Sequence, residues 1–419
     1  MATAPPPSTY IPTYTWTDLG TLPGYTGSSA FALNDAGEVA GDSYDAMANE
    51  SAFRYSGSML SDLGVLNLGE SSVGFGINSS GVVAGMSFVV SVSHFAVTWS
   101  GTTITDISGG IDSWANDVND GGDVVGTMGA LGKAFVYHGA SLTDLNTLVM
   151  GGDPMTLNVA RSINNGGDIV GSATTASGLR GFLFHAGTVT NLGVLGGTSA
   201  NSYADDVNEL GHVLVDNTGS INHAFLWDGS RHDLGTLPGY PYTAGFGLND
   251  SDWAVGTMSA GQGNEHAFVW VAGRLVDLNT RVKLPAGWVV QRAFDINNVG
   301  QIITQVTGGG HVRAVLLTPS NVTRTFGSSR YDTAAKISHD NYTADQPLAF
   351  VATGLNFPDA LAGAALAGRE GAPLLLVPAT GTLPATVATE LGRLNPTSIV
   401  ILGGTGAVSD AMELQLAYI

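Results

Sequence analysis

The sequence is dominated by a turn that recurs seven times, at intervals of 41 to 48 residues. Each copy begins with Asn after a Leu, Ile or Val, and six copies carry Gly three residues later, with Asp252 as the exception. Asn at the first position and Gly at the fourth favour a type I turn. Each copy therefore predicts a hairpin between two strands. The seven residues are Asn34, Asn78, Asn119, Asn164, Asn208, Asn249 and Asn297.

Further positions repeat with the turn. The residue four before each Asn is always Ala or Gly, which predicts crowding where innermost strands converge on an axis. A third strand alternates aromatic residues, as at Phe53 and Tyr55, so that both face the core. A fourth strand ends in Asp-Leu or a close variant. Four short strands in about 44 residues is the period of a β-propeller blade.

The register of the repeats predicts how the ring closes. Seven strands end in Asp-Leu or its variant, but the first, at 14–19, precedes the first Asn turn, and the last copy stops after its third strand at 315–317. The beginning of the chain is therefore expected to supply the missing strand and remove two exposed edges. We predict an all-β, seven-bladed propeller over residues 13–319. Residues 1–12 are interpreted as a Pro-rich leader without the features of a signal peptide.

Two motifs in this part carry a resemblance. His-Ala-Phe stands at 223–225 and 266–268, and Leu-Gly-Thr-Leu-Pro-Gly-Tyr occurs at 19–25 and 234–240. Residues 13–319 thereby resemble the HAF-repeat family of extracellular proteins. The resemblance implies secretion and does not specify a ligand.

The pattern changes after Pro319. Apolar strands at 348–353, 374–377 and 398–402 alternate with predicted helices, and Gly-rich turns follow each strand. Strands that alternate with helices indicate a parallel sheet buried on both faces. We therefore predict a small three-layer α/β domain over 320–419, which makes the chain a multidomain protein.

Several long motifs make this domain resemble the type 2 cell-wall-binding repeat. They are Arg330–Ala334, Ala352–Ala362, Gly371–Leu376 and Ile401–Gly404. The resemblance implies noncovalent anchoring to an anionic cell-wall polysaccharide of bacteria, and hence an extracellular, cell-wall-associated protein. The family usually carries three tandem copies that pack together. A single copy predicts either a chain that continues beyond Ile419 or a homotrimer formed through 320–419.

The resemblance also implies polymer-binding residues. A Pro-Ile-Leu-Leu motif is associated with polymer binding in the family, and this chain has Pro373, Leu374, Leu375 and Leu376, with Leu in place of Ile. The alternative for the leucines is a buried parallel strand. Arg330 could bind a polymer phosphate in bidentate fashion, or it could hold its own domain through a local ion pair.

Charge and composition exclude several classes. The net charge of −20 argues against a nucleic-acid partner, which needs clustered Lys and Arg. No apolar run is long enough to span a membrane, and the lack of Cys excludes disulfides and thiolate metal sites. No cofactor is expected. Binding an anionic polymer would require a positive patch around Arg330, Lys336, Arg369 and Arg393, or a bridging divalent cation.

Two groups of residues are candidates for a ligand site in the propeller. Asp117, Asp206 and Asp295 stand two residues before the turn Asn in copies three, five and seven. If they face the channel, they could hold a cation or perform acid–base chemistry; the alternative is local hydrogen bonding. The second group, expected on loops between blades, would suit a sugar or protein surface or else pack over nearby prolines. Its members are Tyr25, Tyr240 and Tyr242.

Tryptophan and histidine give two further indications. Trp114, Trp253 and Trp288 occur where the other copies have no aromatic residue. Histidines at strand starts, including His94 and His223, indicate hydrogen bonding between blades rather than zinc.

No catalytic motif was found. The expected function is that of a secreted, non-catalytic display or adhesion protein that binds a glycan or protein through the propeller. The rival hypothesis is a carbohydrate-active enzyme whose propeller carries the active site and whose C-terminal domain tethers it to the wall. Convergent carboxylates at Asp117, Asp206 and Asp295 would favour the rival.

Overall fold

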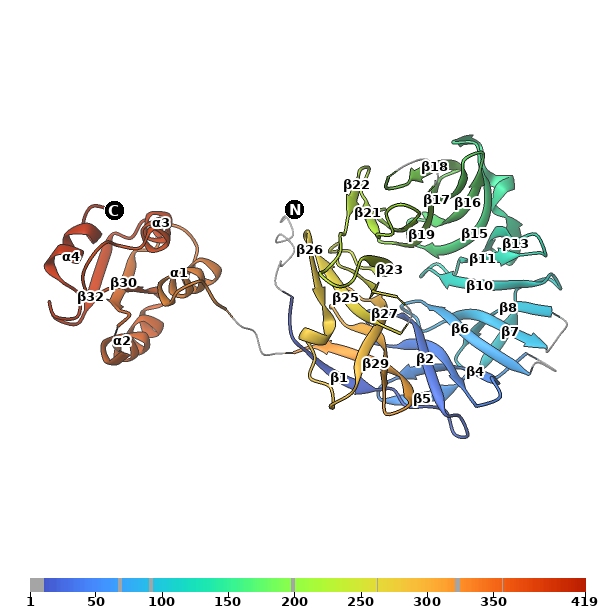
Figure 1. The fold of residues 1–419 in the computed structure, drawn as a ribbon, viewed down its shortest axis with the longest axis horizontal. Helices are drawn as coiled ribbons and strands as arrows, with labels where there is room; N and C mark the ends of the chain where they lie inside the picture. Colours follow the sequence, from blue (N-terminus) through green and yellow to red (C-terminus); the bar gives the residue numbers. More distant parts are fainter. Residues whose placement is uncertain are drawn as a thin grey trace. The chain divides into compact units, whose positions relative to one another are not determined.

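The computed structural model describes residues 11–66, 70–89, 93–196, 200–261, 263–320, 325–355 and 357–419. The chain forms two compact units, Met1–Asn321 and Val322–Ile419. The first is a seven-bladed β-propeller and the second a small α/β unit with a parallel sheet, so the predicted fold class is confirmed (Figure 1).

Each blade is an antiparallel sheet of four strands, numbered here in chain order, and blade 4 carries a fifth strand, β14 (Gly151–Gly152). The innermost strands are β2 (Gly27–Leu33), β6 (Ser71–Ile77), β10 (Ser113–Val118), β15 (Thr156–Ile163), β19 (Asn201–Val207), β23 (Tyr242–Leu248) and β27 (Val289–Ile296). The second strands are β3 (Val39–Tyr44), β7 (Val83–Val89), β11 (Val124–Met128), β16 (Ile169–Thr175), β20 (Val213–Thr218), β24 (Ala254–Ser259) and β28 (Ile302–Gly308).

The third strands are β4 (Glu50–Ser56), β8 (Ser93–Ser100), β12 (Lys133–His138), β17 (Gly178–His185), β21 (Phe225–Trp227), β25 (Glu265–Val271) and β29 (His311–Pro319). All but β29 carry the repeated aromatic residues. The outer strands are β5 (Met59–Asp62), β9 (Thr103–Asp106), β13 (Ser141–Asp144), β18 (Thr188–Gly193), β22 (Arg231–Asp233), β26 (Arg274–Asp277) and β1 (Tyr14–Asp18). Short 3-10 helices follow β13 and β26, at Leu145–Leu148 and Leu278–Thr280.

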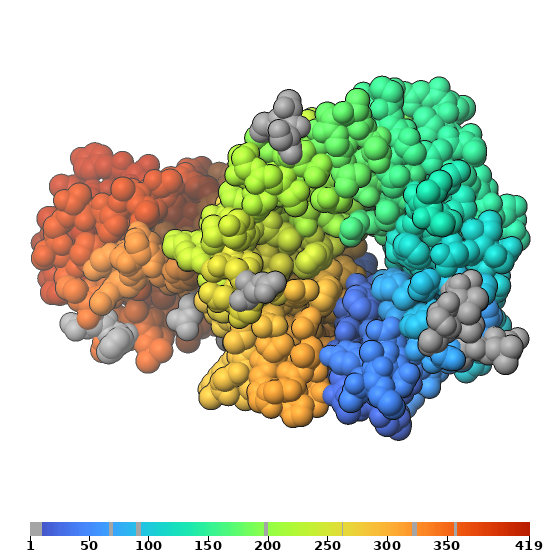
Figure 2. Space-filling model, turned by 45° about the vertical axis from the view of Figure 1, so that its right-hand side comes forward, coloured from blue at the N-terminus to red at the C-terminus, as the bar shows by residue number. Residues whose placement is uncertain are grey.

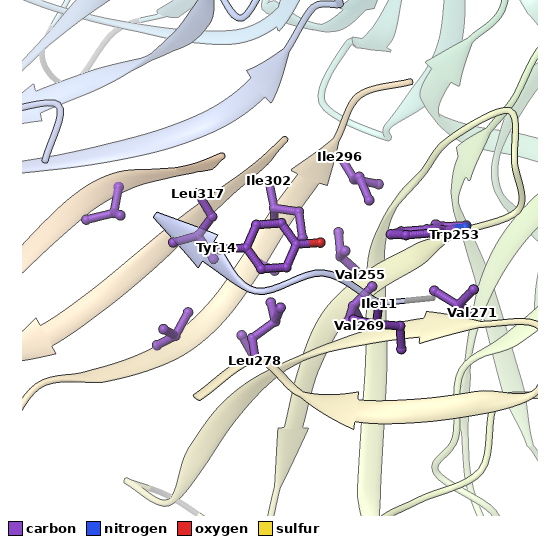
Figure 3. Close-up of a cluster of buried hydrophobic side chains, with 14 of the residues drawn as sticks. Ile11, Tyr14, Trp253, Val255, Val269, Val271, Leu278, Ile296, Ile302 and Leu317 are labelled. Atoms are coloured by element: carbon purple, nitrogen blue, oxygen red, sulfur yellow. The ribbon is translucent and has the colours of Figure 1, made fainter. Parts of the chain in front are cut away.

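The outer strand of blade 7 comes from the beginning of the chain. Strand β1 pairs antiparallel with β29, from Tyr14 opposite Pro319 to Asp18 opposite Val315. Ile11 and Tyr14 are 2% and 5% exposed, and they lie in one cluster with Trp253 (Figure 3). Ile11 was expected in the leader, but its burial places it in the propeller. Residues 1–10 of that leader lie outside the described residues.

The Asp-Leu repeat ends the outer strands for a local reason. The Asp, or Asn191 in blade 4, accepts a hydrogen bond from the backbone N–H two residues later in all seven copies, as from Gly64 to Asp62 at 2.8 Å. In six blades the strand ends at this Asx turn, whereas β18 continues to Gly193. The following Leu or Ile is at most 7% exposed in every copy, so the turn also directs an apolar side chain into the core.

The invariant small residue lies where side chains crowd. A Cβ at Gly245 would lie 2.7 Å from the Leu214 side chain of blade 5, and a Cβ at Gly74 would lie 2.8 Å from Val83 of its own blade and 3.6 Å from Ala40 of blade 1. The crowding therefore comes from the preceding blade at Gly245 and mainly from the adjacent strand at Gly74.

The C-terminal unit alternates helices and strands: α1 (Arg330–Asn341), β30 (Leu348–Thr353), α2 (Phe357–Glu370), β31 (Leu374–Val377), α3 (Ala385–Leu394), β32 (Ser398–Leu402) and α4 (Asp410–Leu416). The parallel sheet has the order β31-β30-β32. One face packs against α1, α3 and α4 through Leu375 and Met412, and the other against α2 through Phe350 and Ala367. Among the described helices, none is both long and apolar enough to cross a membrane.

Candidate functional site

The seven turn asparagines form a closed ring around the channel. Each Nδ2 donates a hydrogen bond to the backbone oxygen of the corresponding Asn in the next blade, at 2.9–3.3 Å, and the last bond runs from Asn297 to Asn34. Each Oδ1 also accepts from its own turn, as from Val82 N–H to Asn78 at 2.9 Å. All seven residues are 4 to 6% exposed. The repeated Asn therefore joins blades as well as forming the turn.

The three candidate aspartates also connect blades. Asp117 accepts from Ile163 N–H at 2.9 Å, Asp206 from Leu248 N–H at 2.7 Å and Asp295 from Leu33 N–H at 2.8 Å. Each donor belongs to the next blade. The Ser162 hydroxyl bonds both Asp117, at 3.1 Å, and Asp206, at 2.8 Å. Each carboxylate also accepts from the N–H of the residue that follows it, at 2.7–2.8 Å, so the local hydrogen bonding considered from the sequence accompanies a bond between blades at all three.

These aspartates nevertheless line one cavity of about 430 Å³ in the channel. Burial raises the pKa of all three carboxyl groups, to about 7 for Asp295. At Asp206 the charge of Asp295 adds to the effect of burial. In the described part of the chain, no group of three or more His, Asp or Glu side chains is arranged to hold a metal ion. Burial therefore favours the protonated form of these carboxyl groups, up to about pH 7 for Asp295, whereas a metal site at this position is not supported.

A second ring lies at β-bulges in the innermost strands. The pairing of each innermost strand shifts by one residue directly after the invariant Ala or Gly. Bulges redirect a side chain. The seven bulge residues line a cavity of about 440 Å³, which Trp114 and Val159 complete. Figure 2 shows an opening between the blades at the centre of the propeller.

Four consecutive blades place phenylalanine at the bulge. Phe246 and Phe294 have ring centroids 5.7 Å apart, Phe294 and Phe31 are 5.8 Å apart, and Phe31 and Phe75 are 5.4 Å apart. All four side chains are half-buried. They form a continuous aromatic arc, a name we keep below for Phe246, Phe294, Phe31 and Phe75.

The other three bulge residues are polar. Arg161 Nη1 lies 2.9 Å from Asp205 Oδ1, and Asn116 Nδ2 donates to the Ala160 oxygen at 2.7 Å. The Asp205 side chain is 8% exposed, and its Oδ2 is buried without a hydrogen-bond partner. Burial raises the pKa of Asp205 to about 6, against the opposing effect of Arg161, and burial and the Asp205 charge raise the pKa of Asp216 well above its usual range.

Sequence reasoning did not identify the bulge ring. It singled out Trp114, which lines the cavity, but not the position three residues before each Asn. That position carries Phe in copies six, seven, one and two, which are neighbours only when the copies are arranged in a circle. The four Phe are visible in the sequence, but they are recognised as one group only when copies seven and one are known to be neighbours.

The three candidate tyrosines lie apart from both cavities. Tyr25 and Tyr240 pack against the hydrophobic clusters of their blades, and Tyr240 also contacts the His266 ring at a centroid distance of 4.9 Å. Tyr242 was expected on a loop but begins strand β23, where it is 46% exposed.

The histidines were expected to connect blades. His94 does contact Asp112 of the next blade at 3.2 Å. His223 and His266 instead contact the outer-strand Asp of their own blades, Asp233 at 3.0 Å and Asp277 at 2.7 Å.

In the C-terminal unit the predicted polymer-binding residues lie on strand β31 and on helix α1. Pro373 and Leu375 are buried, whereas Leu374 and Leu376 are half-buried, and the Pro373 oxygen accepts from Phe350 N–H at 2.8 Å. Arg330 is exposed and donates from Nη1 to the Gly354 oxygen at 2.5 Å. The contact is a hydrogen bond to a backbone carbonyl and not the local ion pair considered from the sequence.

The remaining basic side chains of this unit have acidic partners. Lys336 lies 2.9 Å from Asp340, Arg369 2.6 Å from Glu370 and Arg393 2.6 Å from Glu390. The expected positive patch around these residues is therefore largely neutralised in the described unit.

Comparison with solved structures adds evidence on the fold. A puromycin-hydrolysing peptidase of Mycobacterium tuberculosis is 12% identical with a TM-score of 0.50, over 76% of this chain and 55% of that chain. YCF48 bound to D1 peptide is 12% identical with a TM-score of 0.46, over 77% and 99%. Cwp8 from Clostridium difficile is 22% identical with a TM-score of 0.23, over 29% of this chain and only 25% of Cwp8.

The first of these similarities, at 12% identity, concerns the fold alone. Among curated proteins none matches the chain. The HAF-repeat resemblance of the propeller stays a prediction. In the C-terminal unit, residues 324–413 match the family model Cell wall binding domain 2 (CWB2), so this chain carries a cell-wall-binding domain.

Proposed function

We propose that this chain is a secreted, non-catalytic surface protein of bacteria, held noncovalently on an anionic cell-wall polysaccharide by its C-terminal unit and displaying the propeller outward. The observation that carries the proposal is the CWB2 match over 324–413, in a unit whose motif residues Arg330 and Pro373–Leu376 occupy defined places on α1 and β31. The propeller would then be the part that meets a partner, a glycan or a protein.

Charge constrains how the wall polymer is bound. Residues 320–419 contain five Lys and Arg against eight Asp and Glu, and three of the five pair with acidic side chains. Arg330 is the exposed cation whose recorded partner is a neutral carbonyl, so it keeps its charge for a phosphate or carboxylate of the polymer. A divalent cation bridging polymer and protein carboxylates is the alternative.

A binding assay tests this proposal. The full chain and the fragments 1–321 and 322–419 are incubated with purified wall polymer, and bound protein is measured after sedimentation. Binding is expected from the full chain and from 322–419, and Arg330→Ala should weaken it several-fold. Arg369→Ala, an exposed residue paired with its neighbour Glu370, is the matched control. Loss of binding in EDTA would indicate a bridging cation, and binding by 1–321 alone would contradict the proposal.

The surface of the C-terminal unit supports self-association. Leu355, Leu361 and Leu414 are 57, 75 and 59% exposed, which is unusual for leucine. We propose that three copies of the unit cover these side chains in a cyclic homotrimer. Light scattering should give a trimer for the full chain and a monomer for 1–321. A trimeric 1–321 fragment would place the interface in the wrong unit.

An enzyme is the second candidate, because three carboxyl groups with raised pKa values line one cavity, as acid–base chemistry requires. This candidate is a wall-tethered, carbohydrate-active enzyme with Asp206 as the proton donor. Release of reducing sugar from wall glycan by the full chain, abolished by Asp206→Asn, would support it. Absence of release by the full chain would contradict it.

A further inference from the structure

The bulge ring differs from every other repeated feature of the propeller because it divides the channel wall into two chemically distinct parts. Blades 6, 7, 1 and 2 contribute the aromatic arc, and blades 3, 4 and 5 contribute Asn116, Arg161 and Asp205. A residue needed only for blade geometry would repeat in all copies, as the ring Asn does. Blade geometry therefore does not require one residue type at the bulge position, whereas it does require Asn three residues later.

The aromatic arc offers ring surface to the channel without offering hydrogen bonds. The rings contact one another at 5.4–5.8 Å yet remain half-buried, so part of their surface faces the cavity. The faces of aromatic rings carry partial negative charge and attract cations as well as apolar groups. An apolar group that carries a positive charge satisfies both properties.

Opposite the aromatic arc, Asp205 provides a carboxylate that lines the same cavity. Its side chain is 8% exposed; Oδ1 contacts Arg161, whereas Oδ2 is enclosed by the protein. Arg161 itself is 45% exposed, so it can move aside without being desolvated further.

The charge of the channel lining also favours a positively charged ligand. The channel cavity adjoining the bulge ring is lined by eight Asp and Glu residues but by one basic residue, Arg161. Even with several of these carboxyl groups protonated, the field in the channel attracts cations and repels anions.

We propose that the bulge ring is a binding site for an organic cation, whose ammonium group lies beside the Asp205 carboxylate and whose apolar body lies against the aromatic arc. The cavity of about 440 Å³ is within the usual size of small-ligand sites. The same chemistry occurs in a free amine and in a cationic side chain of a peptide. This site goes beyond wall attachment and does not depend on it.

Three probes with one carbon skeleton test the charge requirement. Phenethylammonium, 2-phenylethanol and phenylacetate are titrated into the full chain at neutral pH, with ligand-observed NMR and calorimetry as readouts. Phenethylammonium is expected to bind at least about tenfold more tightly than the alcohol, and phenylacetate should bind most weakly. A peptide with a single Lys side chain as competitor then distinguishes a free amine from a peptide source.

Variants of the full chain test the residues. Asp205→Asn should lower the affinity for phenethylammonium about tenfold and leave that for the alcohol unchanged. Phe294→Leu, which keeps an apolar side chain but removes the ring, should lower the affinity for the cation more than for the alcohol. Phe326→Leu, at an exposed Phe of the C-terminal unit, is the matched control and should change neither. Thermal melting verifies that each variant is folded.

The proposal is overturned by any of three results: no saturable binding of phenethylammonium, equal affinity for the cation and the alcohol, or the same affinity in Asp205→Asn as in Phe326→Leu. None of these results bears on wall binding, which is measured on 322–419. Failure of one proposal is therefore distinguishable from failure of the other.

Discussion

Two rings encircle the channel, the bulge ring within the innermost strands and the Asn ring in the turns that follow them, and they differ in how strictly they repeat. The Asn ring has the same residue in all seven blades, and each Asn bonds the next blade. The bulge ring holds four kinds of residue, divided into an aromatic and a polar half. A residue that is the same in all seven copies is one that a blade needs in order to join its neighbour. A position at which the residue differs between copies is available for contact with a ligand.

The largest expected loss of stability follows from opening the propeller, on whose closure both rings depend. Deleting residues 1–20 removes β1 and the buried side chains of Ile11, Tyr14 and Leu19. Because each buried apolar side chain contributes about 1.5–3 kcal/mol, we expect the free energy of unfolding to fall by roughly 5 kcal/mol. Denaturant unfolding measures this. An unchanged melting temperature in the truncated chain would show that β1 does not close the ring.

The next effect concerns the Asn ring itself. Asn78→Ala removes two bonds within its turn and the bond to the Asn119 oxygen. Since the freed groups stay buried, unfolding should become easier by about 3 kcal/mol. Asn78→Asp retains the acceptor for the turn but loses the donor to blade 3, so its cost isolates the bond between blades. If Asn78→Asp is as stable as the natural protein, the ring has no energetic role.

The sequence predicted the repeated features well and the divergent ones poorly, for a physical reason. The seven Asn turns and seven Asp-Leu strands made the blades predictable, because each depends on hydrogen bonds between residues close together in the sequence. Counting the strands of the repeats predicted that residues 14–18 complete the last blade. The alternation of apolar and helix-forming segments predicted the helices and strands of the C-terminal unit. Phe246 and Phe75 are 171 residues apart in the chain but lie in one arc, so only the closed circle brings them together.

An intermediate effect concerns the aspartates beside the Asn ring. Burial raises the pKa of Asp295 from near 4 in the unfolded chain to about 7, so the folded state binds an extra proton between these values. The free energy of unfolding should therefore decrease as pH rises from about 4 to about 7. Since each pKa unit corresponds to about 1.4 kcal/mol, Asp295→Asn should remove about 4 kcal/mol of this decrease.

The control for that measurement is Glu70→Gln, at an exposed propeller residue that loses the same charge. Urea unfolding at several pH values compares the two variants with the natural protein. Equal pH dependence in Asp295→Asn and Glu70→Gln would show that the buried carboxyl group does not take up the proton.

The smallest expected effect is at the bulge ring. Phe75 is half-buried and contacts Phe31, but it makes no bond between blades. Phe75→Leu keeps most of the apolar contact, so the free energy of unfolding should change by less than about 1 kcal/mol. Asn78→Ala, on the same hairpin, is measured in parallel. A much smaller loss of stability in Phe75→Leu would show that the blade does not depend on the bulge residue. A cost equal to that of Asn78→Ala would mean that the aromatic arc holds the propeller together, and the separation of a structural ring from a ligand ring would then fail.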